Sequence, residues 1–143
     1  MQWEYVDKIE QMDQKELAKR VKEVMAYKIE VPIVTLPYVA KEKEIVEYKT
    51  KELTAKCPMT GIKDFYVLTI RFEPDKLLPE LKNLKKYLAA YDSLPISHEH
   101  LAAKIYQDFK AAVQPKKLQL ILDTAIRGGI KTTVQLGSPV SPA

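Results

Sequence analysis

Cysteine and asparagine are scarce in this chain of 143 residues. Cys57 is the only cysteine, which excludes an internal disulfide and any metal site built from several cysteines. Asn83 is the only asparagine. A scarcity of asparagine, whose side-chain amide is thermolabile, together with abundant lysine and glutamate is a tendency of proteins from hyperthermophiles.

The sequence also lacks a long apolar run. No run approaches the roughly 20 residues that span a bilayer, and the polar, acidic segment 1–14 resembles neither a signal peptide nor a transit peptide. We therefore expect no membrane association and a cytoplasmic location, which a single cysteine fits. The formal net charge of +4 either favours a polyanionic partner such as nucleic acid or serves only solubility.

Hydrophobic periodicity predicts a leading helix followed by the order β-β-α-α-β-β. Helices are expected over residues 13–28, 79–91 and 97–113, and strands over residues 45–54, 65–73, 118–123 and 130–136. This order predicts an α+β domain with an antiparallel sheet and helices on one face. Because a four-stranded sheet leaves two open edges, we expect the chain to associate with further copies.

Cys57 lies in a predicted turn between two strands, so its thiol is not expected deep in the core. The adjacent Lys56 favours the thiolate. Asp64 begins the next strand, and a hairpin would return it toward the sulfur as a proton shuttle. The other interpretation of a lone cysteine is an inert, small apolar residue.

Both histidines lie in the segment 97–100, which reads Ser-His-Glu-His. A metal site would need a third ligand, and residues two apart on a helix point to different faces, so we predict no metal. Glu99 is either an exposed residue favoured by the helix dipole or a buried carboxylate. In the second case it would accept two hydrogen bonds from a guanine-like edge.

Three lysines, Lys82, Lys85 and Lys86, fall within about one turn of a predicted helix. They could hold the phosphates of a nucleotide or of RNA. A solvated helix face is the other interpretation of the same pattern.

Four blocks together resemble one family, the nitrile reductases that convert 7-cyano-7-deazaguanine to its aminomethyl form. The blocks are Cys57-Pro58-x-Thr60-Gly61-x-x-Asp64-Phe65, Glu80-Leu81-Lys82-x-Leu84-Lys85-x-Tyr87-Leu88, His98-Glu99 and Arg127-Gly128-Gly129-Ile130. The resemblance covers about residues 45–134. It implies the tunnelling fold, whose subunits associate edge to edge into barrels, here a decamer-like barrel pair. We accordingly expect an N-terminal helix and extended lead-in over 1–40, the catalytic domain over 41–137, and a disordered tail over 138–143.

The resemblance also implies roles for individual residues. Cys57 would attack the nitrile to give a covalent thioimide, and Asp64 would donate a proton to the nitrile nitrogen. Glu99 would anchor the guanine-like edge, with His98 beside it.

The second block implies a further set of contacts. Glu80, Lys82 and Lys85 match the segment that the reductases use for NADPH, and we place Glu80 among the substrate-binding residues. Lys82, Lys85 and Arg127 are the expected phosphate-binding residues, for tRNA or for a cofactor.

The chain departs from the reductases at three places. Asn83 replaces a small residue, Lys86 replaces a common leucine, and Tyr91-Asp92-Ser93 stands where Phe-Arg-Asn is frequent. An acid in place of arginine disfavours a cofactor phosphate.

A sister group resembles the reductases but lacks the cofactor site and performs amidino transfer in archaeosine synthesis. There the same thioimide forms with the base already inside tRNA, and ammonia resolves it. We therefore predict an amidinotransferase that needs no cofactor, with tRNA carrying cyano-deazaguanine and ammonia as partners. The alternative is the NADPH-dependent reductase that makes 7-aminomethyl-7-deazaguanine for queuosine biosynthesis.

Overall fold

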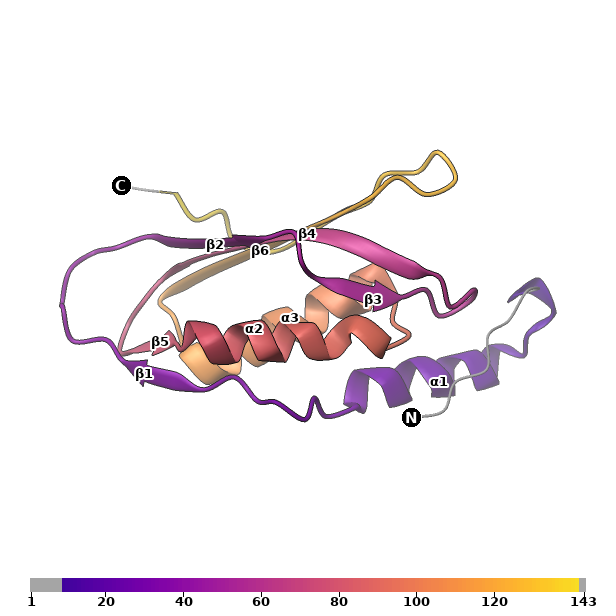
Figure 1. The fold of residues 1–143 in the computed structure, drawn as a ribbon, viewed down its shortest axis with the longest axis horizontal. Helices are drawn as coiled ribbons and strands as arrows, with labels where there is room; N and C mark the ends of the chain where they lie inside the picture. The colour runs from indigo at the N-terminus through magenta and orange to yellow at the C-terminus, as the bar shows by residue number, and fades with distance from the viewer. Residues whose placement is uncertain (1–8, 142–143) are drawn as a thin grey trace.

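In the computed structural model, which describes residues 9–141, an antiparallel sheet lies over a layer of helices (Figure 1). The strands are β1 (Thr35–Pro37), β2 (Val46–Thr50), β3 (Thr54–Lys56), β4 (Lys63–Glu73), β5 (Leu77–Pro79), β6 (Lys117–Thr124) and β7 (Thr133–Gly137). The helices are α1 (Gln14–Ala26), α2 (Leu81–Ala89) and α3 (His98–Val113), with 3-10 turns at Ile9–Gln11 and Ala90–Ser93. The main sheet has the order β2-β4-β6-β7, all antiparallel. The predicted α+β class, with an antiparallel sheet and helices on one face, is confirmed.

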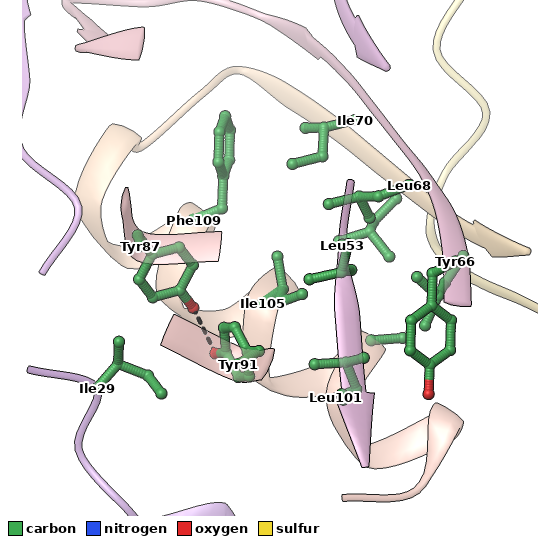
Figure 2. Packing of buried hydrophobic residues seen from close by; sticks show 14 of the residues in the cluster. Ile29, Leu53, Tyr66, Leu68, Ile70, Tyr87, Tyr91, Leu101, Ile105 and Phe109 are labelled. Atoms are coloured by element: carbon green, nitrogen blue, oxygen red, sulfur yellow. Dashed lines mark hydrogen bonds between the residues drawn. The ribbon is translucent and has the colours of Figure 1, made fainter. Parts of the chain in front are cut away.

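The core lies between the sheet and the helices. On β4 the alternating residues Tyr66, Leu68, Ile70 and Phe72 are each at most 2% exposed, as the period of two predicts. Phe72 packs edge-on against Phe109 of α3, with ring centroids 5.2 Å apart. Figure 2 shows this cluster, in which side chains of β4 and of the helices point toward one another.

The predicted strand 45–54 is instead two short strands, β2 and β3, which both pair with β4. The chain bends between them because the Glu52 N–H donates to Thr50 Oγ1 at 3.1 Å. Leu53 then turns inward and is 1% exposed. The bend therefore places Leu53 in the core, beyond the end of β2 at Thr50.

Both core helices begin at caps. Glu80 caps α2, which is shorter than the predicted 79–91 because Pro79 belongs to β5 and residues 90–93 form a 3-10 turn. Ser97 caps α3 as predicted, and its hydroxyl accepts from the His100 N–H. Gln114, with φ 51°, ends α3 in the left-handed conformation.

The N-terminal lead-in packs on the same core as the rest of the chain. Val24 and Ile29 are 3% and 6% exposed within the common apolar cluster. Further along the lead-in, β1 pairs with β5. The division of the chain at residue 40 stays a prediction.

The described part of the segment expected to be disordered, residues 138–141, makes an ordered contact. Val140 is 2% exposed, and its N–H donates to Gln119 Oε1 at 3.2 Å. The expectation of disorder therefore differs from the structure at Val140, because an apolar side chain there finds a buried position. Residues 142–143 lie outside the described residues.

Two strands of the main sheet, β2 and β7, stand at its edges in the part of the chain that is described. The barrel-like oligomer predicted from such edges stays a prediction. Every helix within residues 9–141 is too short or too polar to cross a membrane.

Candidate active site

Cys57 opens the turn that joins β3 to β4. Its N–H donates to the Ile62 carbonyl and its carbonyl accepts from the Gly61 N–H, both at 2.9 Å. Gly61 has φ 74°, a left-handed conformation that favours glycine. The thiol is free and half-buried, so it lies at the margin of the core, as predicted from its place in a turn.

The start of α3 is fastened beside this turn. The Lys56 N–H donates to the Leu94 carbonyl, and the Ile96 N–H donates to the Lys56 carbonyl, both at 3.0 Å. Lys56 and Pro95 thus form a parallel bridge that precedes Cys57 on one segment and Ser97 on the other. The fold thereby brings the first and third sequence blocks, the Cys57 turn and the His98–Glu99 pair, to one end of the molecule.

Asp64 is the buried carboxylate of this end. It faces Ala55 across the β3–β4 hairpin and is only 5% exposed. Arg127 Nη2 lies 2.9 Å from Asp64 Oδ1 and also donates to the Lys63 carbonyl. The predicted phosphate-binding residue Arg127 is therefore engaged with a carboxylate in this chain.

Arg127 reaches Asp64 because the β6–β7 connection bends back on itself. Arg127 and Ile130 exchange two backbone hydrogen bonds of 2.9 Å, and Gly128 and Gly129 between them both have positive φ, 56° and 80°. A side chain at either glycine would strain this turn.

Tyr66 is a site residue that the sequence reasoning missed. Its hydroxyl lies 2.8 Å from His98 Nδ1, and the two rings meet edge-on with centroids 5.4 Å apart. Tyrosine continues the apolar alternation of β4, so the sequence pattern alone indicates a core residue. The available signal was its position two residues after Asp64, which places both side chains on one face of the strand.

The surroundings of Tyr66 show how closely the site residues gather. Burial is the largest cause that raises the pKa of the Tyr66 hydroxyl, followed by the negative charge of Asp64 and that of Cys57. Arg127 acts in the opposite direction, and Glu99 raises the pKa further. One hydroxyl therefore lies within the electrostatic reach of four predicted site residues.

Glu99 is exposed in this chain, so the interpretation of it as a buried acceptor is wrong for the single subunit. It lies in the first turn of α3, where the helix dipole favours its charge. The carboxylate is thus free to meet a ligand that approaches this end from solvent.

The second predicted group lies at the other end of the helical layer. Glu80 caps α2, accepting from the Lys82 N–H at 3.0 Å and the Asn83 N–H at 2.7 Å, and these bonds lower the pKa of its carboxyl. The first turn of α2 lies beside β5, opposite the end that holds β3 and the Cys57 turn (Figure 1). Within one subunit, the start of α2, with Glu80 and Lys82, is therefore not brought to the Cys57 turn. Lys85, one turn further along α2, lines a pocket with Glu52 and Leu53.

Neither histidine has the surroundings of a metal ligand. His98 Nδ1 faces the Tyr66 hydroxyl, and His100 Nδ1 lies 2.6 Å from Ser97 Oγ. Among residues 9–141 no cluster of three or more histidine, cysteine or acidic side chains could hold a metal ion.

Comparisons with known proteins show the family of the chain and its fold. The sequence profile of the family described as "QueF-like protein" matches residues 63–141, more than half of the chain. Two similar relatives, from Caldicellulosiruptor bescii and Thermoanaerobacter pseudethanolicus, are both named NADPH-dependent 7-cyano-7-deazaguanine reductase. The first is 42% identical over 100 residues, which cover 69% of this chain and 76% of the relative. The second is 44% identical over 90 residues, which cover 63% of this chain and 68% of the relative. The chain thus belongs to the QueF-like family.

A solved structure shares the fold. The crystal structure titled as the archaeosine synthase QueF-Like in the apo form matches with a TM-score of 0.64 over 71% of this chain and 100% of that one. At 24% identity this likeness concerns the fold alone. It confirms the predicted tunnelling fold of the subunit.

Proposed function

We propose that this chain is an enzyme that attacks the nitrile of a 7-cyano-7-deazaguanine with the Cys57 sulfur. The observation that carries the proposal is that Cys57, Asp64 and Glu99 all lie within electrostatic reach of one hydroxyl, that of Tyr66, which contacts His98. The chain also belongs to a family with relatives named for that substrate. Asp64 accepts the thiol proton and passes it to the nitrile nitrogen. A carbon–sulfur bond forms, one carbon–nitrogen π bond breaks, and a thioimide results.

The activity that we propose is the NADPH-dependent reduction, in place of the amidino transfer that the sequence favoured. The relatives at 42% and 44% identity carry this name, and the family match spans all of α2. Lys82 and Lys85 are exposed on α2, whose first turn has no acidic residue, so they fit the phosphates of a dinucleotide. NADPH supplies hydride when bound, and conversion of a nitrile to an amine takes up two hydrides and two protons.

The structure also weakens the reasons for preferring amidino transfer. Asn83, a departure from the reductases, accepts from the Val34 N–H at 2.6 Å and donates to the Pro32 carbonyl at 2.8 Å. Asp92, the acid in place of arginine, accepts from Thr54 Oγ1 at 2.6 Å and pairs with Lys63 Nζ at 2.8 Å. These two departures each have a structural role that needs no change of second substrate, whereas no contact within residues 9–141 explains Lys86.

Amidino transfer to tRNA is the second candidate, favoured by the net charge of +4 and by the exposed lysines Lys82, Lys85 and Lys86. In that reaction ammonia would add to the thioimide carbon and the Cys57 thiolate would leave, giving the amidine. Phosphate contacts would make tRNA binding weaken steeply with salt.

Two parallel reactions test the proposal. In one, the protein receives the free base and NADPH; in the other, it receives tRNA carrying the cyano base and ammonium, and products are identified by mass. We expect NADPH oxidation with two equivalents consumed per base, and none with Cys57→Ala. Amidine on the tRNA without NADPH oxidation would establish the second candidate, and the absence of an adduct with either substrate would refute both.

The separation of the first turn of α2 from the Cys57 turn leads to a proposal about assembly. If Lys82 serves the reaction at Cys57, it comes from another subunit, and the edge strands β2 and β7 offer the means of association. We propose a homo-oligomer active in the cytoplasm. Sedimentation of an active monomer at micromolar concentration would contradict the shared site.

A further inference from the structure

Tyr66 and His98 form a pair that the proposed chemistry has not yet used. Tyr66 is 2% exposed, and within residues 9–141 its hydroxyl has one hydrogen-bond partner, His98 Nδ1 at 2.8 Å. The ring of His98 is half-buried at the start of α3, edge-on to the tyrosine. The His98 ring is thus held against Tyr66 by two contacts, one polar and one aromatic.

The direction of this hydrogen bond follows from what each group can do. A buried tyrosine hydroxyl needs an acceptor for its proton, and Nδ1 is the acceptor that the described residues provide. If Nδ1 carried the proton instead, the hydroxyl proton would be left without an acceptor. Tyr66 therefore donates and Nδ1 accepts, which in a neutral imidazole places the proton on Nε2.

We propose that Tyr66 is a positioning residue that holds His98 as the Nε2–H tautomer, so that His98 acts toward the substrate as a hydrogen-bond donor. The inference rests on the proposed function and deepens it. Tyr66 makes no contact with the reacting atoms in this account; it acts through His98 alone.

The chemistry of a guanine-like ring shows what such a donor is for. Its edge presents a carbonyl oxygen next to an N–H and an amino group. Glu99 can accept from the N–H and the amino group, and a neutral His98 with a proton on Nε2 can donate to the carbonyl oxygen. The consecutive residues His98 and Glu99 would thus recognise the carbonyl oxygen and the two ring donors together. In a ring with an amino group at position 6, that amino group would face the Nε2–H of His98, so two donors would oppose each other.

The chain is well suited to a direct test, because it contains only two histidines. Nitrogen-15 labelling of histidine followed by long-range proton–nitrogen correlation spectra reports the tautomer of each imidazole. The wild-type protein should show His98 in the Nε2–H form. Tyr66→Phe keeps the ring and removes the hydroxyl, so the His98 signals should shift toward a mixture of tautomers.

Controls are available within the same protein. His100 faces Ser97 rather than Tyr66, so its signals should stay unchanged in Tyr66→Phe. Tyr48→Phe removes the hydroxyl of a half-buried tyrosine on β2 and should leave both histidines unchanged. Equal His98 shifts in Tyr48→Phe would point to a general loosening of the fold.

Kinetics provide the second readout. Tyr66→Phe should raise the KM for the base about three- to tenfold, the size expected for one misdirected hydrogen bond, with a smaller change in kcat. It should also lower discrimination against a 6-amino analogue. A wild-type His98 with its proton on Nδ1 would overturn the inference even if the reductase assay succeeds, whereas a failed assay with the Nε2–H tautomer present would refute only the proposed function.

Discussion

Replacing Asn83 tests whether one side chain fastens the lead-in to α2. Its amide makes two hydrogen bonds across the chain, with the Val34 N–H and the Pro32 carbonyl, and the Glu80 N–H adds a third bond to the Val34 carbonyl. In Asn83→Ala the first two are lost and the third remains. The fold should stay intact, because the lead-in also contributes Val24 and Ile29 to the core.

The magnitude follows from these bonds. Each contributes about 1 kcal/mol net, and both lie where water can partly replace them. Alanine offsets roughly 0.5 kcal/mol through its higher helix propensity. We expect a loss of about 1–2 kcal/mol in the free energy of local opening, which corresponds to roughly five- to thirtyfold faster hydrogen exchange at the Val34 amide.

Native-state hydrogen exchange read residue by residue is the suitable assay. Lys86→Ala is the matched control, since Lys86 is exposed on the same helix and its substitution should leave Val34 unchanged. Amides of β4 should exchange at the wild-type rate in both variants. Unchanged protection of Val34 in Asn83→Ala would refute the reasoning, because it would mean that the side chain does not hold the lead-in.

Three further predictions concern single side chains. Tyr87→Phe removes a hydroxyl that donates to Asp108 Oδ2 at 2.6 Å and lies 2.7 Å from the buried Tyr91 hydroxyl (Figure 2). Urea unfolding should show that the free energy of unfolding falls by about 1–3 kcal/mol, because the Tyr91 hydroxyl loses its partner. A change near zero would mean that water satisfies Tyr91. Glu80 has a lowered pKa in the folded chain, so its contribution to stability is present above the unfolded pKa of about 4.3 and is lost as pH falls through the folded pKa. In Glu80→Gln the free energy of unfolding should therefore fall less steeply at acid pH than in the wild type. An equally steep fall would contradict this. Glu99→Ala should weaken binding of the free base at least tenfold in calorimetry, measured with Cys57→Ala in both arms, and near-normal affinity would reduce Glu99 to a helix-start residue.

The sequence predicted what depends on local pattern. The alternation of β4, the Ser97 cap and the turn at Cys57 each follow from residues close together in the chain, and the structure confirms them. The bend before Leu53 was not predicted, because a hydrogen bond from the Glu52 N–H to the Thr50 hydroxyl interrupts a segment whose composition is typical of one continuous strand.

The unforeseen parts of the site depend on long-range contacts. Arg127 meets Asp64 only because β4 pairs with β6 in the register that sets Tyr66 opposite Thr124. The partnership of Tyr66 with His98 likewise joins residues 32 positions apart. Periodicity reports which face a residue occupies, and it carries no information about which distant residue occupies the neighbouring face.

The contact of Asn83 on α2 with Pro32 and Val34 of the lead-in has a consequence for the order of folding. Its two side-chain hydrogen bonds join residues 49 and 51 positions apart, so the lead-in leaves the ribosome well before its partners exist. Closing so long a loop costs conformational entropy that is recovered only after α2 has formed. The lead-in is therefore synthesised before the helix that holds it and is among the last segments to find its place, so its apolar residues Val24 and Ile29 stay without those partners until then.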